Sequence, residues 1–166
     1  MLRSVLPGNV TWFFAPPSCI LINTMPTRDE LKKLAHTRLQ EAKVLYANRL
    51  YDGAIYLAGY VEEVALKARI CKILDVEQYP DTGDIGRSFR THKLDDLLRL
   101  AGLQRKFDRA KAVNSNLLIH WSLVTEWSEQ FRYHPVGTSS QGRAQEIIAA
   151  LEDPAYGVFT WLKKYW

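Results

Sequence analysis

The stretch from Tyr51 to Leu74 constrains the fold more than any other part of this 166-residue chain. From Ala54 onward, apolar side chains occur on nearly every side of a helix, whereas a surface helix carries them along one stripe. Small residues such as Ala58 and Gly59 would let neighbouring helices approach closely. Because a helix of this kind has to be packed by several others, the sequence predicts a bundle with this helix at its centre.

Further helices are predicted on both sides of this central one. Thr27 and Glu30 have the spacing of a capping box, which would begin the first helix. The apolar spacing predicts helices over 27–50, 54–74, 92–100, 104–120, 141–152 and 154–166, with 121–133 either continuing the fourth or forming a separate turn. No convincing strand or repeat is present. The predicted fold class is all-α, an up-and-down helical bundle of five to seven helices.

The N-terminal residues differ from the rest of the chain. Among residues 1–24 the single charge is Arg3, and Pro16–Pro17 interrupts the apolar run that a signal peptide would need. We therefore predict an irregular extension over residues 1–25, with Met25 as a candidate natural start. Residues 26–166 are predicted to form a single domain.

Composition limits the classes of partner and cofactor. The formal net charge of +4 favours a phosphate-bearing or acidic partner, and it equally fits a well-solvated surface. Cys19 and Cys71 give neither a zinc spacing nor a disulfide framework, which fits a reducing compartment. No apolar run approaches the roughly 18 to 20 residues of a membrane helix. We expect a cytoplasmic protein with no cofactor, no metal and no membrane partner.

Two groups of polar residues could carry chemistry. Glu63 and Lys67 form an i,i+4 pair within the apolar helix, and the pair serves either structure or a site. The second group lies around the segment between His120 and His134, where aromatic and polar side chains alternate, as in sites that stack bases and hold phosphates. The nucleic-acid-binding candidates are Asn114, Asn116, Arg132 and Tyr133, and the catalytic candidates are His120, Arg132 and His134. The plainer alternative assigns the aromatic residues Trp121, Trp127 and Phe131 to the core.

Three segments carry a family resemblance: Tyr51–Ala68 with its core Glu-Val-Ala-Leu-Lys-Ala, His92–Leu98, and the tryptophan-containing stretch that ends at Arg132–Tyr133. Over about residues 28–152 they resemble the HEPN (higher eukaryotes and prokaryotes nucleotide-binding) domain family. The resemblance implies a helical bundle, commonly a homodimer. It also implies a role in RNA cleavage, or a nucleotidyltransferase partner, in prokaryotic toxin–antitoxin and defence systems.

This sequence departs from the catalytic motif of that family. Active members use an Arg followed, after four to six residues, by a His, and the two cleave RNA at the dimer cleft without metal. The formal match in this sequence is Arg87 with His92, which lies in the loop before the third predicted helix. Before His120, the expected place, Asn114 stands where the Arg would be. An Asn brings no charge to stabilise a developing phosphorane.

These observations predict a HEPN-like protein with a degenerate catalytic motif. It would bind RNA, a nucleotide or a nucleotidyltransferase partner. One alternative is a metal-independent endoribonuclease, a toxin, that uses His120 or His134 with Arg132, or the Arg87–His92 pair. The other is a purely structural dimerisation module, in which the charges of the central helix only pair with one another.

Overall fold

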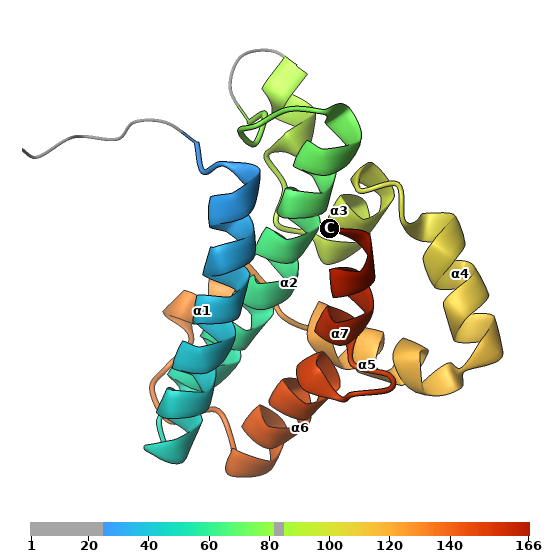
Figure 1. The fold of residues 1–166 in the computed structure, drawn as a ribbon. Coiled ribbons are helices and arrows are strands. Elements are labelled where there is room, and N and C mark those ends of the chain that lie inside the picture. The colour runs from blue at the N-terminus through green and yellow to red at the C-terminus, as the bar shows by residue number, and fades with distance from the viewer. Residues whose placement is uncertain (1–24, 82–84) are drawn as a thin grey trace, which may run out of the picture.

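The computed structural model describes residues 25–81 and 85–166, so the predicted N-terminal extension lies outside the described residues except for Met25. The helices follow in the order α1 (Arg28–Ala47), α2 (Tyr51–Leu74), η1 (Ile85–Phe89), α3 (Leu94–Leu100), α4 (Gln104–Val113), α5 (Ser115–Thr125), η2 (Glu129–Tyr133), α6 (Gln141–Glu152), α7 (Val158–Leu162) and η3 (Lys163–Tyr165). Within the described part of the chain there is no strand, only an isolated bridge between Thr27 and Gln78. The predicted all-α bundle is confirmed (Figure 1).

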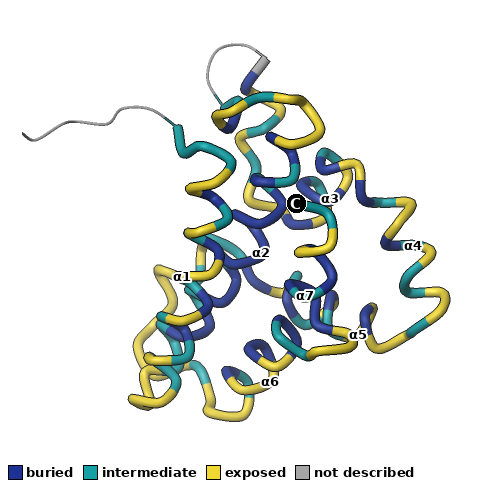
Figure 2. Tube along the Cα trace, in the orientation of Figure 1, coloured by how far each residue is buried: buried dark blue, intermediate teal, exposed yellow. Residues whose placement is uncertain are grey.

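The predicted central helix is α2. It runs antiparallel to α1 and contacts α1, α3, α5, α6, α7 and η2, which explains why its apolar residues are not confined to one stripe (Figure 1). Figure 2 shows α2 buried along most of its length, whereas α1 and α6 alternate buried and exposed turns. The capping box is present at the start of α1, where the Thr27 hydroxyl accepts from the Glu30 backbone N–H.

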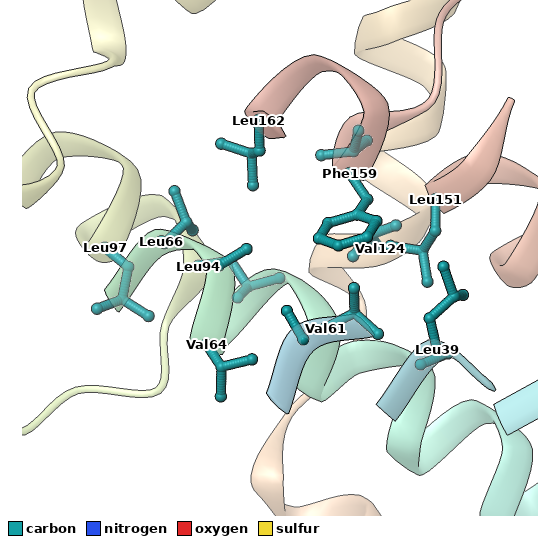
Figure 3. Close-up of a cluster of buried hydrophobic side chains, with 14 of the residues drawn as sticks. Leu39, Val61, Val64, Leu66, Leu94, Leu97, Val124, Leu151, Phe159 and Leu162 are labelled. Atoms are coloured by element: carbon teal, nitrogen blue, oxygen red, sulfur yellow. The ribbon is translucent and has the colours of Figure 1, made fainter. Parts of the chain in front are cut away.

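The core draws on almost every helix. Figure 3 shows side chains from α1, α2, α3, α5, α6 and α7 meeting in one cluster, among them Leu39, Val61, Leu94, Val124, Leu151 and Phe159. All are buried. Each large apolar side chain buried in this way stabilises the fold by roughly 1.5 to 3 kcal/mol. Of the aromatic residues in the core alternative, Trp121 and Trp127 are buried and Phe131 is partly buried against the core.

The break before α2 lies earlier than the sequence suggested. Tyr51, Asp52 and Gly53 form the first turn of α2, and the chain reverses at Asn48–Leu50, where Arg49 has a φ of 62°. Asp52 is held in the helix by a distant segment, because its carboxylate accepts the backbone N–H of Gly137 at 2.6 Å. A prediction based on the turn-forming residues near Asp52 could not include this contact, because Gly137 is far away in the sequence.

The predicted 104–120 helix is two helices. The chain is extended at Asn114 (φ −145°, ψ 110°), and its side-chain oxygen accepts the Asn116 backbone N–H at 2.9 Å, which caps α5. Helix α5 continues to Thr125, so 121–133 supplies both an extension and the separate turn η2. Near the C-terminus Asp153 caps a turn rather than a helix, and α7 begins only at Val158.

Candidate functional site

A groove of about 670 Å³ lies between α4, the start of α5 and the segment from Ala155 to Tyr165. We call it the basic groove. Its walls carry Lys106, Arg109, Asn114, Tyr156, Trp161, Lys164 and Tyr165, together with small and apolar side chains, and the lining includes no acidic residue. Figure 1 shows α4 standing apart from α2, with α7 and the C-terminal turn between them. Leu117 and Trp161 of the groove lining are buried residues of the core.

The aromatic side chains of the basic groove are fixed by the core beneath them. Trp161 is buried. The centre of its ring lies 5.6 Å from that of Phe107 and 5.1 Å from that of Tyr165, and both pairs meet edge to face. The Lys106 ammonium lies 4.5 Å from the centre of the Tyr165 ring, within the range of a cation–π contact. Cations and ring faces thus share one surface, which the sequence did not indicate because Lys106 and Tyr165 are far apart along the chain.

One sequence candidate, Asn114, lines this groove, and a second, His120, contacts its lining residue Tyr156. The side-chain oxygen of Asn114 is occupied by the cap of α5. The Nδ1 atom of His120 lies 3.0 Å from the backbone carbonyl oxygen of Tyr156, so Nδ1 donates its hydrogen there and Nε2 is the atom free to exchange a proton. Asn116 is exposed on the first turn of α5.

The other candidates of this segment lie on η2 (Arg132 and Tyr133) or directly after it (His134), and η2 packs against α2. The Arg132 guanidinium lies over the Tyr133 ring at 5.0 Å, and it also interacts electrostatically with Tyr56 of α2. The centre of the His134 ring lies 4.4 Å from the centre of the Phe131 ring. His120 contacts the loop before α7 instead. The structure therefore does not bring His120 together with Arg132 and His134 in one chain.

The predicted Glu63–Lys67 pair is part of a larger cluster. The Lys67 ammonium lies 2.6 Å from one carboxylate oxygen of Glu63, and Nδ1 of His92 lies 3.0 Å from each of the two. The Glu63 side chain is only 2% exposed, and the Lys67 side chain is 16% exposed. We call these three residues the Glu63 cluster. His92 enters it from the loop before α3, a contact between residues far apart in sequence that spacing alone could not reveal.

The two residues of the formal Arg87–His92 match make different contacts. His92 is engaged with Glu63, while Arg87 lies on η1, where its backbone carbonyl accepts the Arg90 N–H. The side chain of Arg87 is exposed.

A second carboxylate on α2, that of Glu62, directly precedes Glu63 in the sequence. Glu62 is fully buried, and neither of its oxygens has a hydrogen-bond partner among the residues that the structure describes. Burial alone raises the pKa of this carboxyl well above its usual range, because a charged form would lose its hydration without gaining a partner. Glu62 is therefore a neutral acid inside the bundle, whereas Glu63 beside it accepts hydrogen bonds from Lys67 and His92.

Neither the basic groove nor the Glu63 cluster has the makeup of a metal centre. Among the residues that the structure describes, no three His, Cys, Asp or Glu side chains are arranged to hold a metal ion. In the same part of the chain, no helix has both the length and the apolar character needed to cross a membrane.

The fold and these sites define a small all-helical protein built around one buried helix, with a cationic, aromatic groove at its side. The family model described as the HEPN domain matches residues 29–153, which is most of the chain, and the protein belongs to the HEPN family. No curated protein and no solved structure gives a significant match. Membership makes it a nucleotide- or RNA-related HEPN-like protein.

Proposed function

We propose that this protein binds single-stranded RNA or a nucleotide in the basic groove. The observation that carries the proposal is the composition of the groove wall: three cations and three aromatic rings, with no acid among the lining residues. Lysine and arginine side chains attract phosphates, and ring faces stack on bases with little sequence preference. The family membership of the chain supports the same class of ligand.

The proposal extends to the setting that the family resemblance implies. We place the protein in the cytoplasm, as a homodimer and in a prokaryotic toxin–antitoxin or defence system, with a nucleotidyltransferase as a candidate partner. In this view the chain acts by binding, and its catalytic motif is degenerate because Asn114 replaces a cation at the edge of the groove.

A metal-independent ribonuclease is the second candidate, and the position of His120 favours it. Its Nδ1 is held by the Tyr156 carbonyl, which leaves Nε2 available for proton transfer beside a groove that also carries Arg109. A histidine with one fixed nitrogen could take a ribose 2′-OH proton, and the Arg109 guanidinium could stabilise the phosphate charge of RNA bound along the groove.

Binding is tested with fluorescence polarisation of a labelled single-stranded RNA of about 12 nucleotides, at roughly 50 and 200 mM salt. The wild type is expected to bind less tightly at the higher salt. The double variant Lys106→Gln/Arg109→Gln is expected to weaken binding and to lower the slope of log K against log salt by about 1.4, since each single-strand phosphate contact contributes about 0.7. Lys32→Gln/Lys33→Gln on α1 removes the same charge elsewhere and is expected to bind like the wild type. Equal losses in both double variants would show a general charge effect and would contradict a groove.

Cleavage is tested separately by incubating the protein with mixed RNA in EDTA. Under the binding proposal the RNA stays intact. Cleavage by the wild type that is lost in His120→Ala, and kept in His134→Ala, would establish the ribonuclease instead and would assign His120 to it.

A further inference from the structure

A second hollow, of about 520 Å³, lies between α1 and the middle of α2, beside Met25 and Pro26. We call it the tyrosine pocket. Its polar lining consists of Arg38, Tyr56, Tyr60, Glu63, Lys67 and Tyr79. The remaining lining is apolar, with side chains such as Leu34 and Leu57. A mainly apolar hollow of this size with a few convergent polar groups has the usual makeup of a small-molecule site.

The carboxylate of the tyrosine pocket is already occupied. Both oxygens of Glu63 accept from His92, and one also accepts from Lys67. Glu63 is the one acid among the lining residues of this pocket. A cationic ligand would have to displace these protein donors, so the free recognition groups are of another kind.

The groups that remain are hydrogen-bond donors. An ammonium has three N–H bonds, and Lys67 gives one to Glu63 while resting 5.1 Å from the centre of the Tyr79 ring. The Tyr56 hydroxyl donates to the Tyr60 oxygen at 3.2 Å, which leaves the Tyr60 O–H as a donor. Burial raises the pKa of Tyr60 to about 12, so this hydroxyl keeps its proton at neutral pH.

Arg38 adds a second cation to the lining. Its side chain is 34% exposed and pairs with Glu41 one turn further along α1, which occupies one edge of the guanidinium. The five N–H bonds of a guanidinium allow it to hold Glu41 and a second anion at once. Two cations and a hydroxyl donor therefore surround an apolar hollow whose carboxylate is already paired.

We propose that the tyrosine pocket binds a small organic anion, a carboxylate carried on an apolar or aromatic body. Lys67, Tyr60 and Arg38 hold the carboxylate through charge-assisted hydrogen bonds, and the body lies against Leu57 and the tyrosine rings. The site is separate from the basic groove, so it gives the protein a small-molecule ligand in addition to its proposed RNA or nucleotide.

Three probes with one ring system and different head groups test this proposal: indole-3-acetate, tryptamine and tryptophol. Their dissociation constants are measured by calorimetry on the whole protein, with amide shifts of Tyr60 and Lys67 locating the site. Indole-3-acetate is expected to bind about tenfold or more tightly than the cationic and neutral analogues, because the pocket offers cationic donors. Equal affinity for all three probes, or binding by none at millimolar concentration, would overturn the proposal.

Matched variants separate the pocket from other causes. Arg38→Met is expected to weaken the binding of indole-3-acetate several-fold. Lys33→Met removes a charge from an exposed position on the same helix and is expected to leave the dissociation constant unchanged. Leu57→Trp fills the apolar wall, keeps every charge and is expected to abolish binding. Binding that survives Leu57→Trp but is lost in Lys106→Gln/Arg109→Gln would place the anion in the basic groove and would refute the pocket.

Discussion

Glu62 shows how one residue can set the pH dependence of a fold. Its carboxyl is fully buried and has no hydrogen-bond partner in the described part of the chain, and burial raises its pKa well above the usual range. The folded state therefore keeps a proton that the unfolded state releases once the pH passes the ordinary value of about 4.5. Stability from this group is fully present below that pH and is lost as the pH rises toward the folded-state pKa.

The variant Glu62→Gln tests this directly, because its side chain has nearly the same shape and cannot ionise. The free energy of unfolding of the wild type is expected to fall relative to the variant by about 1.4 kcal/mol per pH unit above pH 4.5, until the folded-state pKa is reached. Urea unfolding at several pH values between 4.5 and 7.5 measures the difference. Parallel pH profiles for the two proteins would mean that Glu62 is charged in the fold.

Gly59 permits a close approach that the apolar pattern of α2 only hinted at. A Cβ built on Gly59 would lie 2.1 Å from the indole ring of Trp127, and that indole donates its N–H to the Tyr56 carbonyl at 3.1 Å. An added methyl group would force the ring away and break the hydrogen bond.

Gly59→Ala is therefore expected to destabilise the protein by about 1 to 3 kcal/mol. No atom of the described residues lies within 4 Å of a Cβ built on Gly142 of α6, so Gly142→Ala is the control and is expected to be neutral or stabilising by up to about 1 kcal/mol. Both are measured by chemical denaturation followed by circular dichroism. Similar losses in the two variants would indicate a general effect of alanine rather than contact with Trp127.

At the scale of elements, the division between α4 and α5 depends on a single side chain. Asn114 is extended and caps α5, so a periodic apolar pattern that runs through it produced one predicted helix where the structure has two. The break also shapes the basic groove, because Asn114 lies in its wall.

Asn114→Ala is expected to cost about 1 kcal/mol of stability through loss of the cap, and Asn114→Asp is expected to keep it, since a carboxylate accepts the same N–H. Asn116→Ala is the control because only the backbone of Asn116 takes part in the cap. Thermal or urea unfolding of the three variants checks the order. A loss at Asn116→Ala equal to that at Asn114→Ala would contradict the capping role.

At the scale of the whole molecule, the helices differ in how many neighbours hold them. Helix α2 packs against α1, α3, α5, α6, α7 and η2, whereas the main contact of α4 is with α5. Local opening of α4 therefore exposes little core surface, and opening of α2 requires the bundle to come apart.

Hydrogen exchange followed by mass spectrometry is expected to show this difference. Amides in the middle of α2 should exchange only through global unfolding, and amides of α4 should exchange much faster at neutral pH. Bound RNA is expected to slow exchange in α4 if the basic groove is the binding site. Uniform protection across the two helices would contradict the order of stability inferred from their contacts.

Much of the fold could be predicted from the sequence because its signals are local. The apolar circumference of α2, the capping box at Thr27 and the period of α6 each depend on residues a few positions apart, and they indicated a helical bundle. The HEPN family was indicated separately, by the resemblance of three segments of the sequence. Helix ends were less predictable where a distant group decides them. Asp52 belongs to α2 because the backbone near Gly137 binds its carboxylate.

The chain alone therefore determined the class of fold and the central helix, since periodicity and capping act within a few residues, and its resemblance in three segments indicated the family. Only the tertiary structure decided the sites. It brought His92 onto Glu63, set Lys106 against Tyr165 and separated His120 from Arg132. These relations depend on how helices pack in three dimensions, and side chains far apart in sequence acquire a common environment only when the core beneath them has formed.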